Sequence, residues 1–422
     1  MSFYRASEVF VPGGLPQLTY VSRAEGGLER QLRASTENSS KLVTVTGPTK
    51  SGKTVLSKRV LSSRPLVWID GGAVNSEEEF WVTLASALDA VVETTTQTTG
   101  NLEVSVEIEA SGQLKIPLIA QSEVGGRTGG SAGLARTTSR TTSSNHKAEA
   151  IRRLSEGDVA LVVDDFHYLA REIQGAVVRA LKAPIFNGVT VVFIAIPHRR
   201  YDAIRVEREM TARVEQIHIK PWNTDELLEI PHKGFGLLNV AVSARTLALL
   251  ANEALGSPHL MQDFCKQLCF HEEIDATQEY LRQLEETDTT KIFKGVAAGM
   301  NKIAFDRLAR GPSAKTDRRE RLLKDGRRVD IYEAILEAIA SLRPGSQSLD
   351  YEDIRAALRT ILDEAPPRAH EVSRVLDYMS KISASDESSA TIIDWDKESR
   401  RLHVTDPFFA FFLKWGLDEI RN

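Results

Sequence analysis

Residues 41–54 read KLVTVTGPTKSGKT, an apolar run followed by a glycine-rich loop that ends in Lys-Thr. The loop fits the pattern G-x-x-x-x-G-K-[ST], with Gly47, Gly52, Lys53 and Thr54 in register. In this pattern the glycines let backbone N–H groups surround phosphates, the lysine adds a cation at the β and γ phosphates, and the hydroxyl ligates Mg²⁺. An apolar helical pattern, GKTVLSKRVL, follows the loop, as the motif requires. The sequence therefore predicts a nucleotide site built from Gly47, Pro48, Thr49, Lys50, Ser51, Gly52, Lys53 and Thr54.

A second apolar run ends in two acids. In ALVVDDFHYL, residues 160–169, Asp164 and Asp165 follow four apolar residues. Asp164 is placed to hold Mg²⁺, directly or through water, and Asp165 to orient an attacking water. Many ATPases carry Glu at the second position. Because Asp is one methylene shorter, we expect slow turnover.

Five short runs rich in Val and Ile indicate strands that are buried on both faces. They are KLVTVT, RPLVWID, VALVVDD, VTVVFIAI and VEQIHIK. Helical patterns such as FWVTLASALDAVV lie between them, which favours a parallel sheet covered by helices. We assign residues 41–222 to an α/β phosphate-loop NTPase core and residues 1–40 to a segment that approaches the nucleotide.

Residues 94–145 interrupt this pattern and are rich in Thr, Ser and Gly, a composition too poor for a packed core. Within them, LEVSVEIEA alternates with period two and QLKIPLIAQ follows a Ser-Gly turn, so a hairpin insert is predicted. Its arms approach the ~9–11 residues of a membrane-spanning strand, which raises the hypothesis of a pore. Pro117 and three glutamates argue against it and favour a loop that contacts neighbouring subunits or a partner.

The remainder of the chain is mostly helical. NTDELLEI starts with a capping residue and begins a helical lid, residues 223–290. A basic, polar stretch suggests an exposed connector over residues 291–327. Residues 328–422 then read helix, helix, helix and two short strands, the order of an α+β winged-helix domain.

The bulk properties fit a globular protein. The chain has 422 residues and a net charge of −5, so overall charge gives no pull toward nucleic acid. Cys265 and Cys269 are four residues apart on an expected helix, which favours buried thiols over a disulfide or metal site. No signal peptide or long apolar run is visible, so a cytoplasmic protein is expected and a membrane partner is not.

Several further stretches carry a family resemblance: TYVSRAEGGLERQL, FIAIPHR, TARVEQIHIKPW, GSPHLMQ and DPFFAFFLKW. With the two core motifs, they resemble ATPases of the AAA+ and STAND superfamily, in its origin-recognition-like and archaeal-ATPase branches. The resemblance covers most of the chain outside residues 94–145. It implies ATP and Mg²⁺ as cofactors and hydrolysis to ADP and phosphate.

The resemblance also implies roles for individual residues. Val21 and Arg23 match the entry motif that approaches the base, and His198 stands at the polar sensor, where Asn or Thr is more usual. Arg213, with Arg208 as second choice, matches the arginine finger. His259 occupies the second sensor, where these proteins usually carry Arg.

Two functions compete. The first is a regulatory switch that assembles with itself and signals to a separate effector protein, for instance in bacterial or archaeal defence. The alternative is a DNA-binding initiator or transposition regulator that inserts the third winged-domain helix, RAHEVSRVLDYMSKIS, into a major groove. That helix carries Arg368, Arg374 and Lys381 but also Glu371 and Asp377, a weak basic bias, so signalling is preferred.

Overall fold

The computed structural model describes residues 2–23, 27–37, 40–97, 105–108, 114–115, 143–196, 213–299, 302–312, 319–345, 348–384 and 392–417. The chain divides into two compact units. The core unit is Ala24–Gly47 with Lys53–Ile219. The C-terminal unit is Met1–Arg23, Pro48–Gly52 and Lys220–Asn422. The middle of the phosphate loop is therefore grouped with the C-terminal unit.

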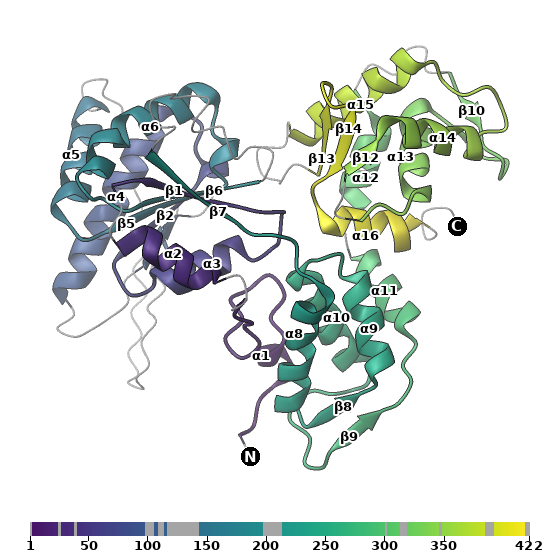
Figure 1. Ribbon diagram of the computed structural model, residues 1–422, viewed down its shortest axis with the longest axis horizontal. Helices are drawn as coiled ribbons and strands as arrows, with labels where there is room; N and C mark the ends of the chain where they lie inside the picture. Colours follow the sequence, from purple (N-terminus) through teal and green to yellow (C-terminus); the bar gives the residue numbers. More distant parts are fainter. Residues whose placement is uncertain are drawn as a thin grey trace. The chain divides into compact units, whose positions relative to one another are not determined.

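The core unit is built on a seven-stranded sheet with strand order β4-β3-β2-β5-β6-β1-β7 (Figure 1). The strands are β1 Leu42–Thr46, β2 Leu66–Asp70, β3 Ser105–Ile108, β4 Leu114–Lys115, β5 Ala160–Asp164, β6 Val191–Ala195 and β7 Val214–His218. All neighbouring strands are parallel except β3 and β4. The five strands predicted from apolar runs are all present, and the predicted α/β fold class is confirmed.

Helices cover both faces of this sheet (Figure 1). They are α2 Leu28–Glu37, α3 Lys53–Leu61, α4 Glu77–Gln97, α5 Ser143–Glu156 and α6 Arg171–Phe186. Successive strand residues enter opposite cores: Val163 packs with residues of α4, α5 and α6, whereas Val162 packs with residues of α2 and α3. Because every second residue faces the other way, both faces need apolar side chains, which explains the continuous Val and Ile runs.

The predicted hairpin insert contributes to the same sheet. β3 pairs with β4 antiparallel, and β3 also pairs with β2 in parallel register. The hairpin strands therefore extend the edge of the core sheet. The rest of residues 98–142 lies outside the described residues. The hypotheses of a pore and of subunit contacts therefore stay predictions.

The first part of the C-terminal unit is mostly helical, and we call it the lid. It contains α1 Ala6–Val9, α8 Thr224–Leu237, β8 Val240–Val242, α9 Ala244–Glu253, α10 Pro258–His271, β9 Arg282–Leu284 and α11 Thr289–Ala298. The predicted cap at Asn223 is present, because its side chain accepts from Glu226 N at 2.8 Å. Cys265 and Cys269 are buried free thiols on α10, as predicted.

A C-terminal module follows the lid. It contains α12 Lys302–Arg310, β10 Arg321–Leu322, β11 Arg328–Val329, α13 Ile331–Ser341, β12 Ser348–Asp350, α14 Tyr351–Ile361, α15 Ala369–Ala384, β13 Ile393–Asp396, β14 Arg401–Val404 and α16 Pro407–Trp415. Strands β12, β14 and β13 form one antiparallel sheet. Part of the stretch expected as an exposed connector is helical. Phe293 of α11 and Phe305 of α12 are buried because apolar side chains recur there at helical spacing among the charges.

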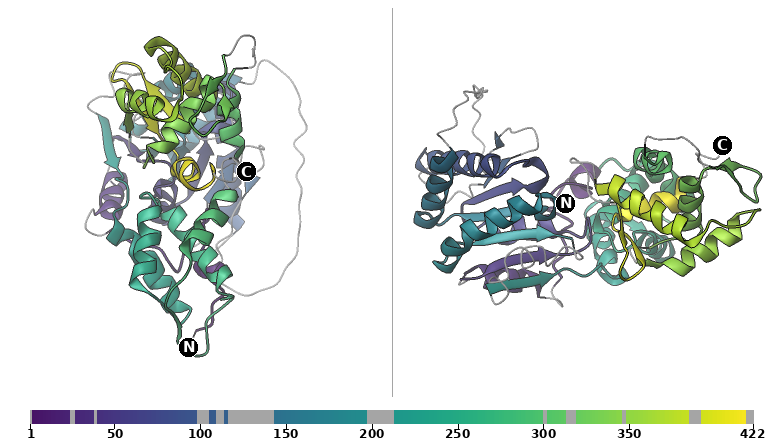
Figure 2. Two further views of the ribbon diagram at one scale, coloured as in Figure 1. Left: turned by 90° about the vertical axis from the view of Figure 1, so that its right-hand side faces the viewer. Right: turned by 90° about the horizontal axis from the view of Figure 1, so that it is seen from above.

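Helix α16 lies at the C-terminal end of the described chain and is drawn in yellow in Figure 2. It contributes side chains to two hydrophobic cores. Phe408 and Phe411 pack with the lid helices, whereas Phe409 and Phe412 belong to the core of the C-terminal module, where α16 contacts α12 and α13. No helix in the described ranges is long and apolar enough to cross a membrane.

Candidate phosphate-binding site

The core unit places the motif lysine at the first residue of α3, directly after the loop. Lys53 is 7% exposed, and its Nζ donates to Gly47 O at 3.1 Å. Burial lowers the pKa of Lys53, and the charges of Asp165 and Asp164 oppose that shift. A buried ammonium beside two carboxylates lies where phosphates would need a cation.

Thr54 and Asp164, the two predicted metal ligands, are in direct contact. Thr54 Oγ1 donates to Asp164 Oδ2 at 2.9 Å. They meet because β1 and β5 run parallel, so α3 and the acid at the end of β5 lie at the same edge of the sheet. Burial raises the pKa of Asp164, against the opposing effects of the Thr54 hydrogen bond and the Lys53 charge.

Asp165 sits in an unusual backbone conformation. Its φ of 48° is left-handed, a region that Asp tolerates better than most residues. Its N–H donates to Asp164 Oδ1 at 2.9 Å, and 42% of its side chain is exposed. Burial and then the Asp164 charge raise the pKa of Asp165 to about 7. Local strain of this kind concentrates at functional sites.

Two neighbours of the acid pair were missed by the sequence analysis. Asp70 ends β2 directly beside Asp164, and its negative charge helps to raise the pKa of both acids. A Cβ added at Gly71 would lie 2.7 Å from Asp165 O and 3.0 Å from Asp164 O, so only glycine fits there. The signal was present, because LVWID ends in an acid as ALVVD does.

The C-terminal unit holds the middle of the loop. The Trp222 Nε1–H donates to Ser51 O at 2.9 Å. Lys50 and Gly52 both have left-handed backbones, with φ of 59° and 92°. Ser51 Oγ is buried without a hydrogen-bond partner among the described residues, and a Cβ at Gly52 would meet no heavy atom within 4 Å. An orphaned hydroxyl and open space beside a glycine both suit a phosphate oxygen.

His259 lies in the same unit, on α10. Its ring packs edge-on against Phe408, and its Nε2 is 3.7 Å from Asp263 Oδ2. Burial, reinforced by the nearby Lys50 charge, lowers the pKa of His259 to about 4. The imidazole is therefore neutral at pH 7.

The remaining predicted residues are distributed as follows. Val21 is buried in the lid core, and Arg23 pairs with Glu226 at 2.8 Å and lies 5.2 Å from the Trp222 ring centroid. Arg213 is exposed, with its guanidinium 5.3 Å from the ring centroid of Phe186. His198 and Arg208 lie outside the described residues.

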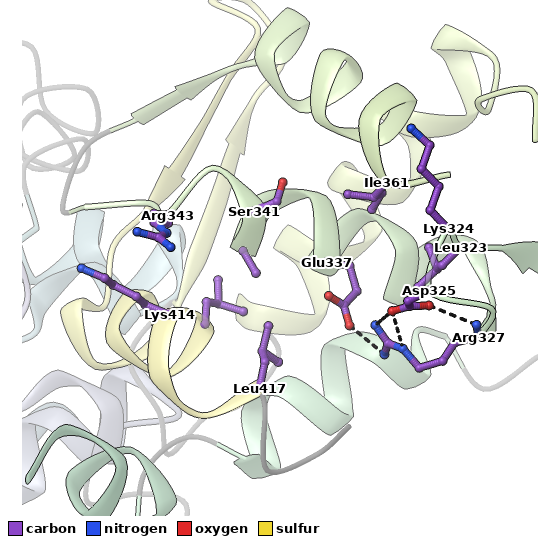
Figure 3. Close-up of a pocket in the computed structure, with 12 residues that line it drawn as sticks. Leu323, Lys324, Asp325, Arg327, Glu337, Ser341, Arg343, Ile361, Lys414 and Leu417 are labelled. Carbon is purple, nitrogen blue, oxygen red and sulfur yellow. Dashed lines mark hydrogen bonds and ion pairs between the residues drawn. The ribbon is translucent and has the colours of Figure 1, made fainter. Parts of the chain in front are cut away.

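A separate groove of about 470 Å³ lies in the C-terminal module (Figure 3). Arg327 spans Asp325 and Glu337 at one end, and Arg343 and Lys414 lie at the other. No phosphate-loop residue lines this groove. We therefore place the candidate nucleotide site at the loop and not in this groove.

No protein-family model matches the sequence, and no curated protein does. The solved structures include a similar fold, the Walker-type ATPase PABY2304 of Pyrococcus abyssi, with 15% identity, 93% of this chain and 96% of that chain covered, and a TM-score of 0.54. The ADP form of the Aeropyrum pernix ORC2 protein is 13% identical over 98% of this chain and 97% of that one, with a TM-score of 0.48. The chain therefore has a phosphate-loop NTPase fold, similar to that of this Walker-type ATPase.

Proposed function

We propose that this protein is a regulatory ATPase of the AAA+ and STAND type, which binds ATP with Mg²⁺ and slowly forms ADP and phosphate. The observation that carries the proposal is the Thr54–Asp164 hydrogen bond of 2.9 Å beside the buried Lys53 ammonium. The loop amides and Lys53 hold the phosphates in this proposal, with Val21, Arg23 and His259 on the base and lid side.

Thr54 and Asp164 would hold Mg²⁺, since their oxygens already lie side by side. No group of three or more His, Cys, Asp or Glu side chains among the described residues could hold a metal. Mg²⁺ is usually bound by one or two side chains together with substrate phosphates. When bound, the ion neutralises charge on those phosphates.

Asp165 orients the attacking water in this proposal. Asp is one methylene shorter than the Glu that many ATPases carry at this position, which supports slow turnover, the behaviour of a switch. His198 remains the proposed polar sensor.

Arg213 is proposed to act on the nucleotide of a neighbouring subunit, so that hydrolysis requires a homo-oligomer. An arginine finger contributes roughly 10³–10⁵-fold to turnover. We expect Arg213→Ala to retain ATP binding and to lose assembly-dependent turnover, measured as phosphate release against protein concentration. Unchanged turnover would place the finger elsewhere.

We infer that the C-terminal module is a winged helix that signals to a separate effector protein. The charges on α15, the helix that would read DNA, support this choice. Asp377 pairs with Lys381 at 2.9 Å and with Lys397 at 2.8 Å, so two of the nearby cations share one carboxylate. A helix that reads a major groove needs its cations available for phosphates and base edges.

Mass photometry tests this function. The purified protein is measured with ADP, with a slowly hydrolysed ATP analogue, and with the analogue plus duplex DNA, alongside Lys53→Ala. Oligomers formed by the parent with the analogue alone, and absent in Lys53→Ala, would support the switch. Assembly that requires DNA would favour the initiator or transposition function instead.

A further inference from the structure

The phosphate loop contains a second lysine whose side chain is held by the last helix of the described chain. Lys50 Nζ lies 3.4 Å from the centroid of the Phe408 ring and 3.9 Å from Asp406 Oδ1. Both partners belong to the N-terminal end of α16. A cation above an aromatic face and beside a carboxylate is favoured most when it is partly shielded from water. The Lys50 side chain is 34% exposed and Asp406 only 9%.

The two α16 residues are themselves held in place. Asp406 is the N-cap of α16, and its Oδ1 accepts from Phe408 N at 2.9 Å. The Phe408 ring is buried in the lid core and meets the His259 ring at a centroid distance of 4.8 Å. Asp406 and Phe408 therefore present a fixed carboxylate and a fixed aromatic face to the loop.

The charged groups that act on Lys50 are two carboxylates. Asp406 and Asp263 attract its ammonium, and His259 is the third titratable group close to it. Phosphates arriving at the loop would carry several negative charges and would compete with these carboxylates for the same ammonium.

We propose that Asp406 and Phe408 are positioning residues for the phosphate loop, which hold the Lys50 ammonium on α16 until nucleotide phosphates draw it away. The C-terminal module thereby lowers nucleotide affinity, and nucleotide binding weakens its hold on the loop by the same factor. This inference rests on the proposed nucleotide binding, and it adds the route by which the loop is linked to α16.

Asp406→Asn removes the negative charge but keeps the N-cap of α16, because Asn caps a helix about as well as Asp. We expect ATP to bind this variant about three- to fivefold tighter than the parent, the scale of one partly exposed ion pair. Lys50→Met should cancel that gain, so that Asp406→Asn has no effect on affinity in the Lys50→Met background. The matched control is Asp330→Asn, which changes the N-cap of α13 and should leave affinity unchanged.

Isothermal titration calorimetry with ATP and Mg²⁺ measures all of these proteins, with melting temperatures recorded in parallel. A purely structural role for Asp406 would change stability and affinity alike with or without Lys50, and that result would overturn the proposal. Unchanged or weaker binding in folded Asp406→Asn would overturn it too. Phe408→Leu, which keeps an apolar residue but removes the aromatic face, should also tighten binding. No binding by the parent would instead contradict the proposed function.

Discussion

Lys50 and Lys53 are three residues apart in one loop, yet their side chains have different partners. Lys53 is almost fully buried in the core unit, bonded to Gly47 O and close to Asp164 and Asp165. Lys50 belongs to the C-terminal unit and contacts Phe408 and Asp406. Short sequence motifs describe the first kind of lysine well, because its partners follow from the strand and helix beside it. They say nothing about the second.

The largest expected effect distinguishes these two lysines. Lys53→Ala should reduce ATP binding by roughly 30- to 1,000-fold, because phosphates lose a buried cation. Lys50→Met should change it far less, since its ammonium already has partners on α16. Calorimetry checks both, with Lys58→Ala on α3 as the control. Equal ATP affinity in the parent and in Lys53→Ala would overturn the site.

A smaller effect is expected on the acid side of the core site. Asp165→Ala should keep ATP affinity within about threefold and lower turnover by roughly 100-fold, the contribution of one positioned proton acceptor. Steady-state phosphate release checks this, at saturating ATP. Asp158→Ala changes an exposed carboxylate just before β5 and serves as the control. Full turnover in Asp165→Ala would assign water activation to another group.

Gly71 lies against the backbone of Asp164 and Asp165 and tests the packing of the core site without changing a charge. A methyl group there would clash with the backbone of Asp164 and Asp165, so Gly71→Ala should lower the free energy of unfolding by about 1–3 kcal/mol. Gly295→Ala is the control, because it adds a methyl group in open space on helix α11 and should stabilise by about 0.5–1 kcal/mol. Urea unfolding of both variants decides. Equal stability of the parent and Gly71→Ala would show that the backbone at Asp164 and Asp165 can move to accommodate a methyl group.

The smallest effect is a pH dependence of stability. The pKa of Asp165 is raised from 3.8 to about 7 in the folded protein, so the folded state holds its proton more tightly than the unfolded state. The associated stability is full below about pH 4 and is lost as the pH rises through 7. Asp165→Asn removes this loss. We expect its melting temperature to exceed the parent's by about 1–2 °C at pH 8, a value kept small by the exposure of the side chain.

The same variant should gain nothing at pH 4, where the parent's Asp165 is already protonated. Melting curves at both pH values make the comparison, without nucleotide or Mg²⁺. A gain of equal size at the two pH values would show that the Asn side chain stabilises the turn by some other contact, and that the Asp165 charge is not the cause.

Much of the core could be predicted from sequence because its signals are local. The apolar runs identified the five strands, and the loop pattern placed Lys53 and Thr54 next to a second strand that ends in Asp164. What was missed depends on the folded chain. Asp70 acquires its importance only through its pairing beside Asp164, and the partners of Lys50 come from the far end of the sequence. No local periodicity encodes such contacts.

Helix α16 determines whether the two parts of the C-terminal unit can fold or unfold separately. Its nine residues supply Phe408 and Phe411 to one hydrophobic core and Phe409 and Phe412 to another. Neither core is complete without this helix, so the lid and the C-terminal module are not separable building blocks. Ending the chain before Pro407 would expose apolar core residues of both the lid and the C-terminal module. Because α16 contributes to both cores, the lid and the C-terminal module should unfold together in a single cooperative step.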